Sequence, residues 1–428
     1  MNSVLKIFSD LFSEKDLKRK ILFTFGILFV FRFLAHIPIP GANITALQNL
    51  FNSSQILGFL NVFTGGGMEN FSLVTLGLGP YINASIIMQL FTKVFPKLEE
   101  MSKEGEFGRI KINQYTRIIA IPMCAMQSYG MFILLSKQGI IGNLSPADVL
   151  RLVVAMTGGS VLLMWLGELI SEYGIGNGIS IIIFSGIVAK LPQSFGQTLA
   201  TVSSQGITNI AIIFTLAIGV VAAVVFVNEA TRNVQVQYAK RLRGGRIYGG
   251  GSNFLPLRVN MAGMIPIIFA VSLVLLPSFL GNVLVSAKSP QLAEIGRVLT
   301  VYFKMGGWIY NAFYFILVFA FTYFYTAVAF NPEDVADNLK KQGGFIPGIR
   351  PGKPTSDYLN RVVTRITLVG ALFLGLVAVL PNVAQSITGI ATLTVGGAGI
   401  LIVVSVVLET VKSLQSQLIM RDYDAKII

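Results

Sequence analysis

The stretch ITNIAIIFTLAIGVVAAVVFV, residues 207–227, holds no charged side chain and is long enough to cross a lipid bilayer as one helix. Outward from it in both directions, the sequence contains nine more predominantly apolar stretches of about 20 residues. These are residues 21–40, 73–92, 117–136, 150–170, 175–191, 261–281, 308–330, 362–381 and 388–411. Only helices and closed barrels satisfy the backbone in lipid, and none of the stretches alternates like a barrel strand. The sequence therefore predicts an all-α integral membrane protein with ten transmembrane helices.

The composition agrees with this prediction over the whole length of the chain. Of the 428 residues, 53% are hydrophobic and only 12% are charged, and the mean hydropathy is +0.70. Soluble domains carry about 25% charged residues, so most classes of soluble enzyme are excluded. The single cysteine, Cys124, rules out an intramolecular disulfide and a cysteine-based metal site.

Basic residues are distributed unevenly between the two sides of the predicted membrane. The chain has 33 Lys and Arg against 20 Asp and Glu, a formal net charge of +13. If the N-terminus is inside, 26 of the 33 basic residues lie in, or at the edges of, cytoplasmic segments, and only six lie on the outer side. The positive-inside rule therefore predicts that both termini are cytoplasmic.

The chemistry of enzymes and ion-coupled transporters is missing from the sequence. The nearest approach to a phosphate-binding loop has Pro354 in place of the hydroxyl residue and Pro347 in place of the first glycine. The spans hold almost no acidic residue, and His36 lies near an outer end, where an interfacial role explains it better than proton transfer. Arg32 lies within the first span at a cost of about 3 kcal/mol, so we expect it to face the bundle interior or a watery cavity.

Two features of the outer and membrane regions need an explanation. Residues 58–70 are too short to span and contain three consecutive glycines, which favours a hinged re-entrant helix, with an ordinary outer loop as the alternative. Ile82 and Ile86 are four residues apart, as are Ile183 and Ile187, so each pair lines one helix face. Spacing alone allows these stripes to face lipid or the protein core.

Two long basic segments lie on the predicted cytoplasmic side. Residues 232–258 and 331–361 carry clusters of Lys and Arg held by glycine and proline turns. The positive-inside rule needs only a few charges near helix ends. Loops of this length are therefore interpreted as docking surfaces for something large and acidic.

Several motifs follow one another along the chain, namely NVFTGGG at 61–67, LGPYINASII at 78–87, GIGNGIS at 174–180 and LPLRVNMAG at 255–263, with further segments at 105–117 and 330–352. Together they closely resemble the SecY family, whose members are central subunits of bacterial protein-conducting channels. The resemblance runs from about residue 18 to the last span. It implies ten transmembrane helices in two inverted pseudo-symmetric five-helix halves around a central pore.

The resemblance also implies a division of the chain into five parts. These are residues 1–20 as a cytoplasmic N-terminal segment, 21–191 as the N-terminal half with helices 1–5 and the plug at 58–70, 192–206 as an outer linker, 207–411 as the C-terminal half with helices 6–10 and the docking loops 232–258 and 331–361, and 412–428 as a cytoplasmic C-terminal tail.

By the same resemblance, aliphatic side chains close the waist of the pore and a plug closes its outer funnel. The pore ring is expected at Ile82, Ile86, Ile183, Ile187, Ile268 and Ile402. The plug is expected at Phe59, Leu60, Asn61, Val62, Phe63, Thr64, Gly65, Gly66 and Gly67. An aliphatic ring suits this role because apolar constrictions gate by dewetting and adapt to any passing sequence.

The resemblance further implies a lateral gate and a cytoplasmic docking site. Apolar substrate segments would leave sideways between spans 2 and 3 and spans 7 and 8, since each buried CH₂ favours lipid by about 0.8 kcal/mol. Gln89 and Asn260 lie on or beside these helices and are expected to tune the gate, with ordinary interhelical hydrogen bonding as the alternative. The docking residues for a motor or ribosome are Lys240, Arg241, Arg243, Arg246 and Arg350.

The function predicted from this resemblance is a passive, non-enzymatic channel of the general secretory pathway. It would pass unfolded secretory proteins across the plasma membrane of a bacterium and release membrane-protein helices through the gate. Energy would come from the SecA ATPase, the translating ribosome or the proton-motive force, and no cofactor or metal is expected. Expected partners are the small subunits SecE and SecG, SecA, the ribosome with its rRNA, signal-bearing precursors and the lipid bilayer.

Two other functions remain open at this stage. An accessory Sec paralogue for specialised substrates would share the same motifs, although their unremarkable form favours the general channel. A secondary transporter for a small solute would also use about ten helices and inverted repeats. The scarcity of acids in the spans and the large basic loops argue against the transporter.

Overall fold

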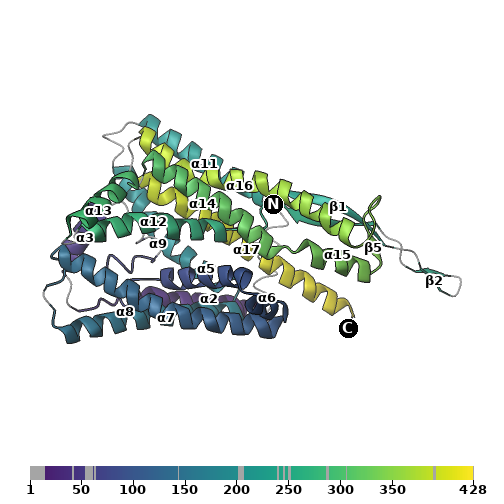
Figure 1. Cartoon of the computed structure of the whole chain (residues 1–428), viewed down its shortest axis with the longest axis horizontal. Helices are drawn as coiled ribbons and strands as arrows, with labels where there is room; N and C mark the ends of the chain where they lie inside the picture. The colour runs from purple at the N-terminus through teal and green to yellow at the C-terminus, as the bar shows by residue number, and fades with distance from the viewer. Residues whose placement is uncertain are drawn as a thin grey trace. The chain divides into compact units, whose positions relative to one another are not determined.

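The computed structural model describes residues 15–40, 43–53, 61, 64–142, 144–200, 207–238, 241–243, 246–248, 252–285, 289–304, 306–388 and 392–427. Over these residues the chain is mainly helical (Figure 1). The helices are α2 (Lys15–Leu34), α3 (Ile44–Ser53), α5 (Gly79–Val94), α6 (Pro96–Lys103), α7 (Glu106–Lys137), α8 (Pro146–Tyr173), α9 (Gly178–Ala200), α11 (Ile207–Glu229), α12 (Ile265–Val285), α13 (Pro290–Tyr302), α14 (Trp308–Ala329), α15 (Pro332–Lys341), α16 (Lys353–Thr388) and α17 (Thr392–Ile427).

Each of the ten predicted spans overlaps one helix. These helices are α2, α5, α7, α8, α9, α11, α12, α14, α16 and α17. Within the described part of the chain, four segments are long and apolar enough to cross a membrane, namely Glu106–Ser136, Pro146–Tyr173, Trp308–Lys341 and Lys353–Gln385. Shorter apolar helices cover Gly178–Gln193, Ile218–Glu229 and Ile265–Ser278.

Two helix starts show how local sequence sets the boundaries. Before α8, the Ser145 hydroxyl accepts a hydrogen bond from the Asp148 N–H at 3.3 Å, and Pro146 occupies the first helical position. Before α15, the Asn331 side chain accepts from the Glu333 N–H at 3.1 Å. Acidic residues in the first turn of α15 and lysines in its last turn complement the helix dipole.

The chain divides into two compact units. The first contains Met1–Ile207, Asn282–Gly296 and Ile390–Ile428, and the second contains Thr208–Gly281 and Arg297–Gly389. In the first unit, α8 packs against α2, α7 and α9, while α9 also packs against α17. In the second unit, α16 packs along both α14 and α15.

The second unit also contains two small antiparallel sheets that the sequence analysis treats only as basic loops. Strand β1 (Thr231–Tyr238) pairs on one side with β4 (Ser252–Arg258) and on the other with β5 (Gly344–Phe345). Strands β2 (Arg241–Arg243) and β3 (Arg246–Tyr248) form a hairpin that extends beyond the end of β1 (Figure 1). The larger sheet has its own core, built from Val234, Leu257, Ile346, Leu359 and Val363.

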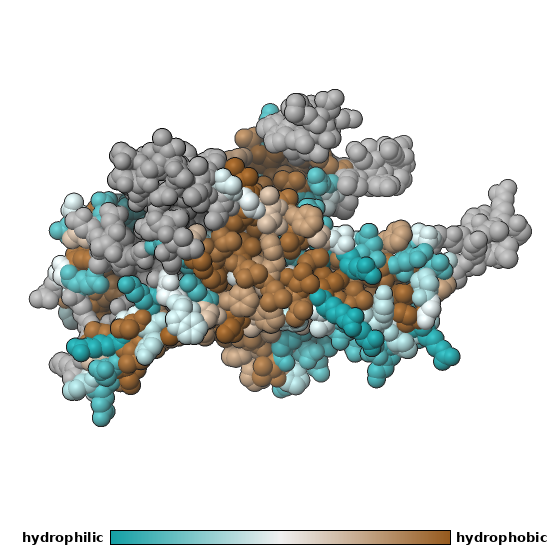
Figure 2. All heavy atoms as spheres, turned by 90° about the horizontal axis from the view of Figure 1, so that it is seen from above, coloured by the Kyte–Doolittle hydropathy of each residue, from teal (hydrophilic) through white to brown (hydrophobic). Residues whose placement is uncertain are grey.

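Many large hydrophobic side chains are exposed on the outer faces of the helices. Phe29 on α2 is 75% exposed, Met126 on α7 is 75% exposed and Phe226 on α11 is 76% exposed. Figure 2 shows a broad hydrophobic area on one face of the molecule. A lipid environment explains these faces, because water-exposed patches of this kind are rare on soluble monomers.

Candidate functional site

The glycine-rich part of the segment between α3 and α5 forms turns. Asn61 is helical, and residues 54–60, 62 and 63 lie outside the described residues, so the re-entrant helix considered for residues 58–70 stays a prediction. Residues 64–71 are consecutive turns, because Gly65 (φ +68°) and Gly66 (φ +86°) adopt the left-handed conformation that favours glycine. Of the predicted plug residues, Asn61, Thr64, Gly65, Gly66 and Gly67 are described, and Phe59, Leu60, Val62 and Phe63 lie outside the described residues.

This segment sits tightly against α2 and α9. A Cβ placed on Gly65 would lie 2.7 Å from Phe31 Cζ and 3.1 Å from the Cα of Gly186, so the backbone is in direct contact with both helices. Arg32 donates from Nη1 to the Gly65 carbonyl oxygen at 2.5 Å. The guanidinium group of Arg32 is therefore paired with a backbone carbonyl of the predicted plug, as expected for a charged group that avoids lipid.

A carboxylate lies at the centre of the polar contacts of the segment. Glu69 forms an ion pair with Lys190 of α9, and its carboxylate accepts a hydrogen bond from Asn61 Nδ2 at 2.8 Å. Burial of the Glu69 carboxyl raises its pKa, but Lys190 and Asn61 outweigh burial, so the pKa is lowered from its ordinary value of 4.5. The carboxylate is therefore charged at neutral pH.

The residues that follow Gly67 are fixed in the first unit. Met68 and Phe71 belong to a buried cluster that includes Leu47, Leu135 and Met156. The chain here also bridges to the end of α2, because the Ile39 N–H donates to the Phe71 carbonyl oxygen at 2.8 Å. The glycine turn is thus held by packing on its C-terminal side.

All six predicted pore-ring isoleucines are buried, which excludes lipid-facing positions for them. Their exposed fractions run from 0% at Ile402 to 9% at Ile82. Ile187 on α9 packs onto α17, since a Cβ on Gly399 would lie 2.9 Å from Ile187 Cγ2. Ile402 is one turn beyond Gly399, so it lies on the face of α17 that meets α9.

The other ring positions lie on separate helices. Ile183 is one turn before Ile187 on α9, and Ile82 and Ile86 lie on α5 in the same unit. Ile268 lies on α12 in the second unit. The ring as a set of six stays a prediction.

A model of the SecY family matches residues 72–411 of the sequence. The chain belongs to the SecY family. It is 41% identical to the protein translocase subunit SecY of Mycobacterium bovis over 443 residues, which cover 98% of this chain and 99% of the relative.

Solved structures of SecY and Sec61 share its fold. One is a SecY protein whose plug domain stabilises the closed state of the translocation channel and maintains a membrane seal (TM-score 0.64, 22% identity, 94% of this chain and 93% of that chain). Another is Sec61 in the canine ribosome-channel complex (TM-score 0.58, 19% identity, 94% and 93%). The predicted fold class, an all-α membrane protein with ten helices in two halves, is confirmed.

The two predicted lateral-gate residues of this SecY chain lie in different units. On α5, Gln89 Nε2 donates to Ser85 Oγ at 3.3 Å, and Gln89 Oε1 is buried without a hydrogen-bond partner. Asn260 is 6% exposed, donates to Asn228 Oδ1 at 2.7 Å and accepts from the Gly263 N–H at 3.0 Å. These contacts of Asn260 fix the turn that leads into α12.

The predicted docking residues of this SecY chain belong to the strands of the second unit and to the turn after β5. Arg241 and Arg243 are in β2, and Arg243 is the register partner of Arg246 in β3. Arg350 is exposed, and its carbonyl oxygen accepts from Thr355 Oγ1 at 2.9 Å. Lys240 lies outside the described residues.

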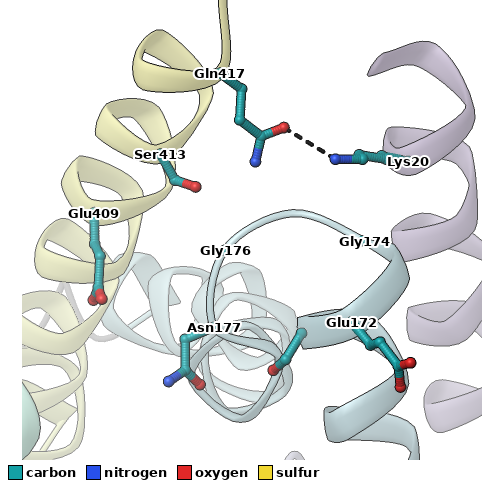
Figure 3. Close-up of a pocket in the computed structure, with 9 residues that line it drawn as sticks. Lys20, Glu172, Gly174, Gly176, Asn177, Glu409, Ser413 and Gln417 are labelled. Atoms are coloured by element: carbon teal, nitrogen blue, oxygen red, sulfur yellow. Dashed lines mark hydrogen bonds between the residues drawn. The ribbon is translucent and has the colours of Figure 1, made fainter. Parts of the chain in front are cut away.

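A polar cavity in the first unit is a feature that sequence reasoning did not predict. It measures about 480 Å³ and lies between the start of α2, the turn from α8 to α9, and α17. Figure 3 shows Glu172 and Glu409 at this cavity and the hydrogen bond from Lys20 Nζ to Gln417 Oε1, which measures 3.4 Å. The turn itself, GIGN at 174–177, joins α8 to α9. No cluster of His, Cys, Asp and Glu in the described part of this SecY chain could hold a metal ion.

Proposed function

We propose that this chain is the pore subunit of a protein translocase, a passive channel that passes unfolded secretory proteins and releases membrane-protein helices sideways. The observation that carries the proposal is the match to a protein translocase subunit over 98% of this chain and 99% of the relative. The accessory-paralogue and small-solute transporter readings have no comparable support from the described residues.

In this proposal, the plug and the ring close the same passage. The position of the glycine turn supports a shared passage, because Gly65 of the predicted plug lies against Gly186, the residue directly before the predicted ring residue Ile187. Buried isoleucines from α5, α9, α12 and α17 would exclude water and ions at rest. An extended peptide could pass because branched aliphatic side chains can change rotamer and move aside without breaking hydrogen bonds.

The lateral gate is proposed to lie at α5 and α7 on one side and α12 and α14 on the other. Gln89 supports this assignment, because a buried amide oxygen without a partner carries a desolvation cost of about 1–3 kcal/mol. Such a group would favour a state in which it regains a partner. Asn260 would act by holding the start of α12.

The cellular setting follows from the same proposal. The chain would lie in the plasma membrane of a bacterium with both termini in the cytoplasm, as the 26 basic residues on that side favour. SecE and SecG would complete the channel, and SecA, the ribosome or the proton-motive force would supply energy. A ribosome-bound Sec61 with the same fold supports the ribosome as a partner.

The decisive experiment is disulfide crosslinking inside a translocating complex. In a Cys124→Ser background, Ile82→Cys supplies the only cysteine, and a secretory precursor with one cysteine is arrested midway. We expect a disulfide only when motor and ATP are present. Ile118→Cys, on a face of α7 where Ile118 is 63% exposed, is the matched control and should give no link.

The possible outcomes separate the parts of the proposal. If the precursor is imported but never links to any ring position, the pore assignment is wrong. If purified channel with SecA imports nothing, the translocase function itself is wrong.

Reversing the charge at Arg350 is expected to slow motor-driven import about tenfold while the channel stays assembled. The physical reason is that Arg350 is exposed in the basic segment 331–361, where a reversed charge repels an acidic partner. Import of a precursor into vesicles measures the effect. Arg151→Glu, at an exposed basic residue outside both docking segments, is the matched control, and an unchanged rate in Arg350→Glu would remove Arg350 from the docking surface.

A further inference from the structure

The glycine turn Gly65–Gly67 separates two sides of the predicted plug segment, and the side after the turn is fixed by packing. On the fixed side, Met68 and Phe71 are buried at 5% and 1% exposure in the core of the first unit. On the other side, the chain leads back through Asn61 into the rest of the predicted plug. A swing of the plug would therefore turn about the glycines, whose backbone allows the change at low cost.

Asn61 and Glu69 tie the two sides together. Asn61 Nδ2 donates to Glu69 Oε2 at 2.8 Å, and the Glu69 N–H donates to Asn61 Oδ1 at 3.0 Å. Asn61 is only 4% exposed, so both bonds are shielded from water. Asn61 cannot move away from Glu69 without breaking both hydrogen bonds. The bond from Asn61 Nδ2 is the stronger one, because it is accepted by a charged carboxylate.

Lys190 forms an ion pair with the Glu69 carboxylate that binds Asn61. Its ammonium group pairs with Glu69, and the two side chains are 18% and 20% exposed. Its stem crosses the glycine turn, since a Cβ on Gly66 would lie 3.1 Å from Lys190 Cε. On α9, Lys190 follows Ile187 by three residues, so it lies one turn from a predicted ring residue.

We propose that Asn61, Glu69 and Lys190 form a clasp that holds the plug closed, and that displacement of α9 opens it. The inference rests on the proposed channel function. While α9 stays in place, Lys190 neutralises and orients the carboxylate, which holds Asn61. When α9 moves, the carboxylate loses its counter-ion in a site that is mostly shielded from water. It then favours hydration, and Asn61 is released.

The first test removes the tie and keeps the fold of the turn. Asn61→Leu has a similar volume but makes neither hydrogen bond, and we expect the ion conductance of resting channels in planar bilayers to rise about tenfold. The matched control is Asn70→Leu, because Asn70 lies beside Glu69 on the fixed side and its side-chain amide donates to the Ala35 carbonyl oxygen at 3.3 Å. Equal conductance in Asn61→Leu and the unaltered channel would overturn the clasp.

The second test exchanges the charges. Lys190→Glu places two carboxylates together and should raise resting conductance at least as much as Asn61→Leu. The double variant Glu69→Lys with Lys190→Glu restores opposite charges and should recover most of the seal. A control for charge reversal alone is Arg151→Glu, which breaks the exposed pair of Arg151 with Asp148. If the double variant leaks as much as Lys190→Glu, the ion pair has no part in closure.

The clasp also has a distinctive pH response. Among the described residues, Lys190 on α9 is the charged group paired with Glu69, and Arg32 on α2 donates to the Gly65 carbonyl oxygen of the glycine turn. Because the pKa of Glu69 is lowered, the clasp is stable at neutral pH and is lost only as the pH falls through that lowered value.

Resting conductance should stay flat between about pH 7 and pH 5 and rise below that range. Glu69→Gln should abolish the rise, and His36→Gln should leave it unchanged. A rise centred between pH 5 and 7 would overturn the role of Glu69.

Import of a precursor into vesicles, measured for the same variants, separates the clasp from the channel. If the unaltered channel imports precursor but no clasp variant leaks, the clasp is wrong and the channel function stands. If the unaltered channel imports nothing, both fall together.

Discussion

Replacing Ile187 by asparagine is expected to make the resting channel conduct ions. Ile187 is 1% exposed and packs against Gly399, so an amide in its place would be buried with no partner prepared for it. An unpaired buried amide costs about 1–3 kcal/mol, which favours a hydrated state by roughly tenfold to a hundredfold. Since apolar constrictions exclude ions by staying dry, hydration removes the seal.

Planar-bilayer recording without motor or precursor measures the effect of Ile187→Asn. Ile187→Val keeps an apolar surface and should leave conductance near the unaltered value. Ile118→Asn introduces the same amide on α7, where the isoleucine is 63% exposed, and should also leave the seal intact. Unchanged conductance in Ile187→Asn would remove this residue from the constriction.

Replacing Gly159 by alanine is expected to destabilise the first unit by about 3 kcal/mol or more. A Cβ on Gly159 would lie 1.8 Å from the Leu73 carbonyl oxygen and 2.6 Å from its carbon, so α8 must move away from the chain that follows the plug. Overpacking of this kind commonly costs about 1–3 kcal/mol, and contact with backbone leaves little room to relax.

The neighbouring glycine provides a stringent control. Gly158 is in the same turn of α8, but a Cβ there would have no atom within 4 Å. Gly158→Ala should therefore be neutral or gain up to about 1 kcal/mol from helix propensity. Thermal unfolding of the two purified variants in detergent gives the comparison. Equal midpoints for Gly158→Ala and Gly159→Ala would contradict the close approach of α8 to Leu73.

The positions of the spans could be predicted from the sequence, but not the full lengths of their helices. The predicted span 362–381 lies inside α16, which begins at Lys353, and most of 388–411 lies in α17, which begins at Thr392 and continues to Ile427. A search for apolar stretches stops where charges begin. Helices continue into water as long as backbone hydrogen bonds and packing support them.

The sheet of the second unit shows a signal that was present in the sequence but was not used. In TRNVQVQY, Val234 and Val236 alternate with polar residues, and both valines are buried in β1. Such a two-residue period is typical of a half-buried strand. The pairing of β1 with β5 could not be predicted, because the two strands are joined only through the intervening helices.

The contacts of the plug were beyond sequence reasoning for a different reason. Arg32 could be assigned to the interior because of the cost of its charge in lipid, but nothing in the sequence pointed to the Gly65 carbonyl. The pair of Glu69 and Lys190 is separated by 121 residues, and neither residue stands out within a motif. Their meeting depends on the approach of α9 to the glycine turn, which is a tertiary property.

The sheet shared by the two basic segments has a mechanical consequence for any partner that pushes on it. Strand β5 belongs to the segment 331–361, yet it is hydrogen-bonded to β1 of the segment 232–258, and Leu359 of α16 lies in their common core. The Val259 N–H, which donates to the Ala230 carbonyl oxygen at 2.9 Å, ties the base of the sheet to the end of α11. A load applied to β1 or β5 therefore passes as torque into α11 and α16 together.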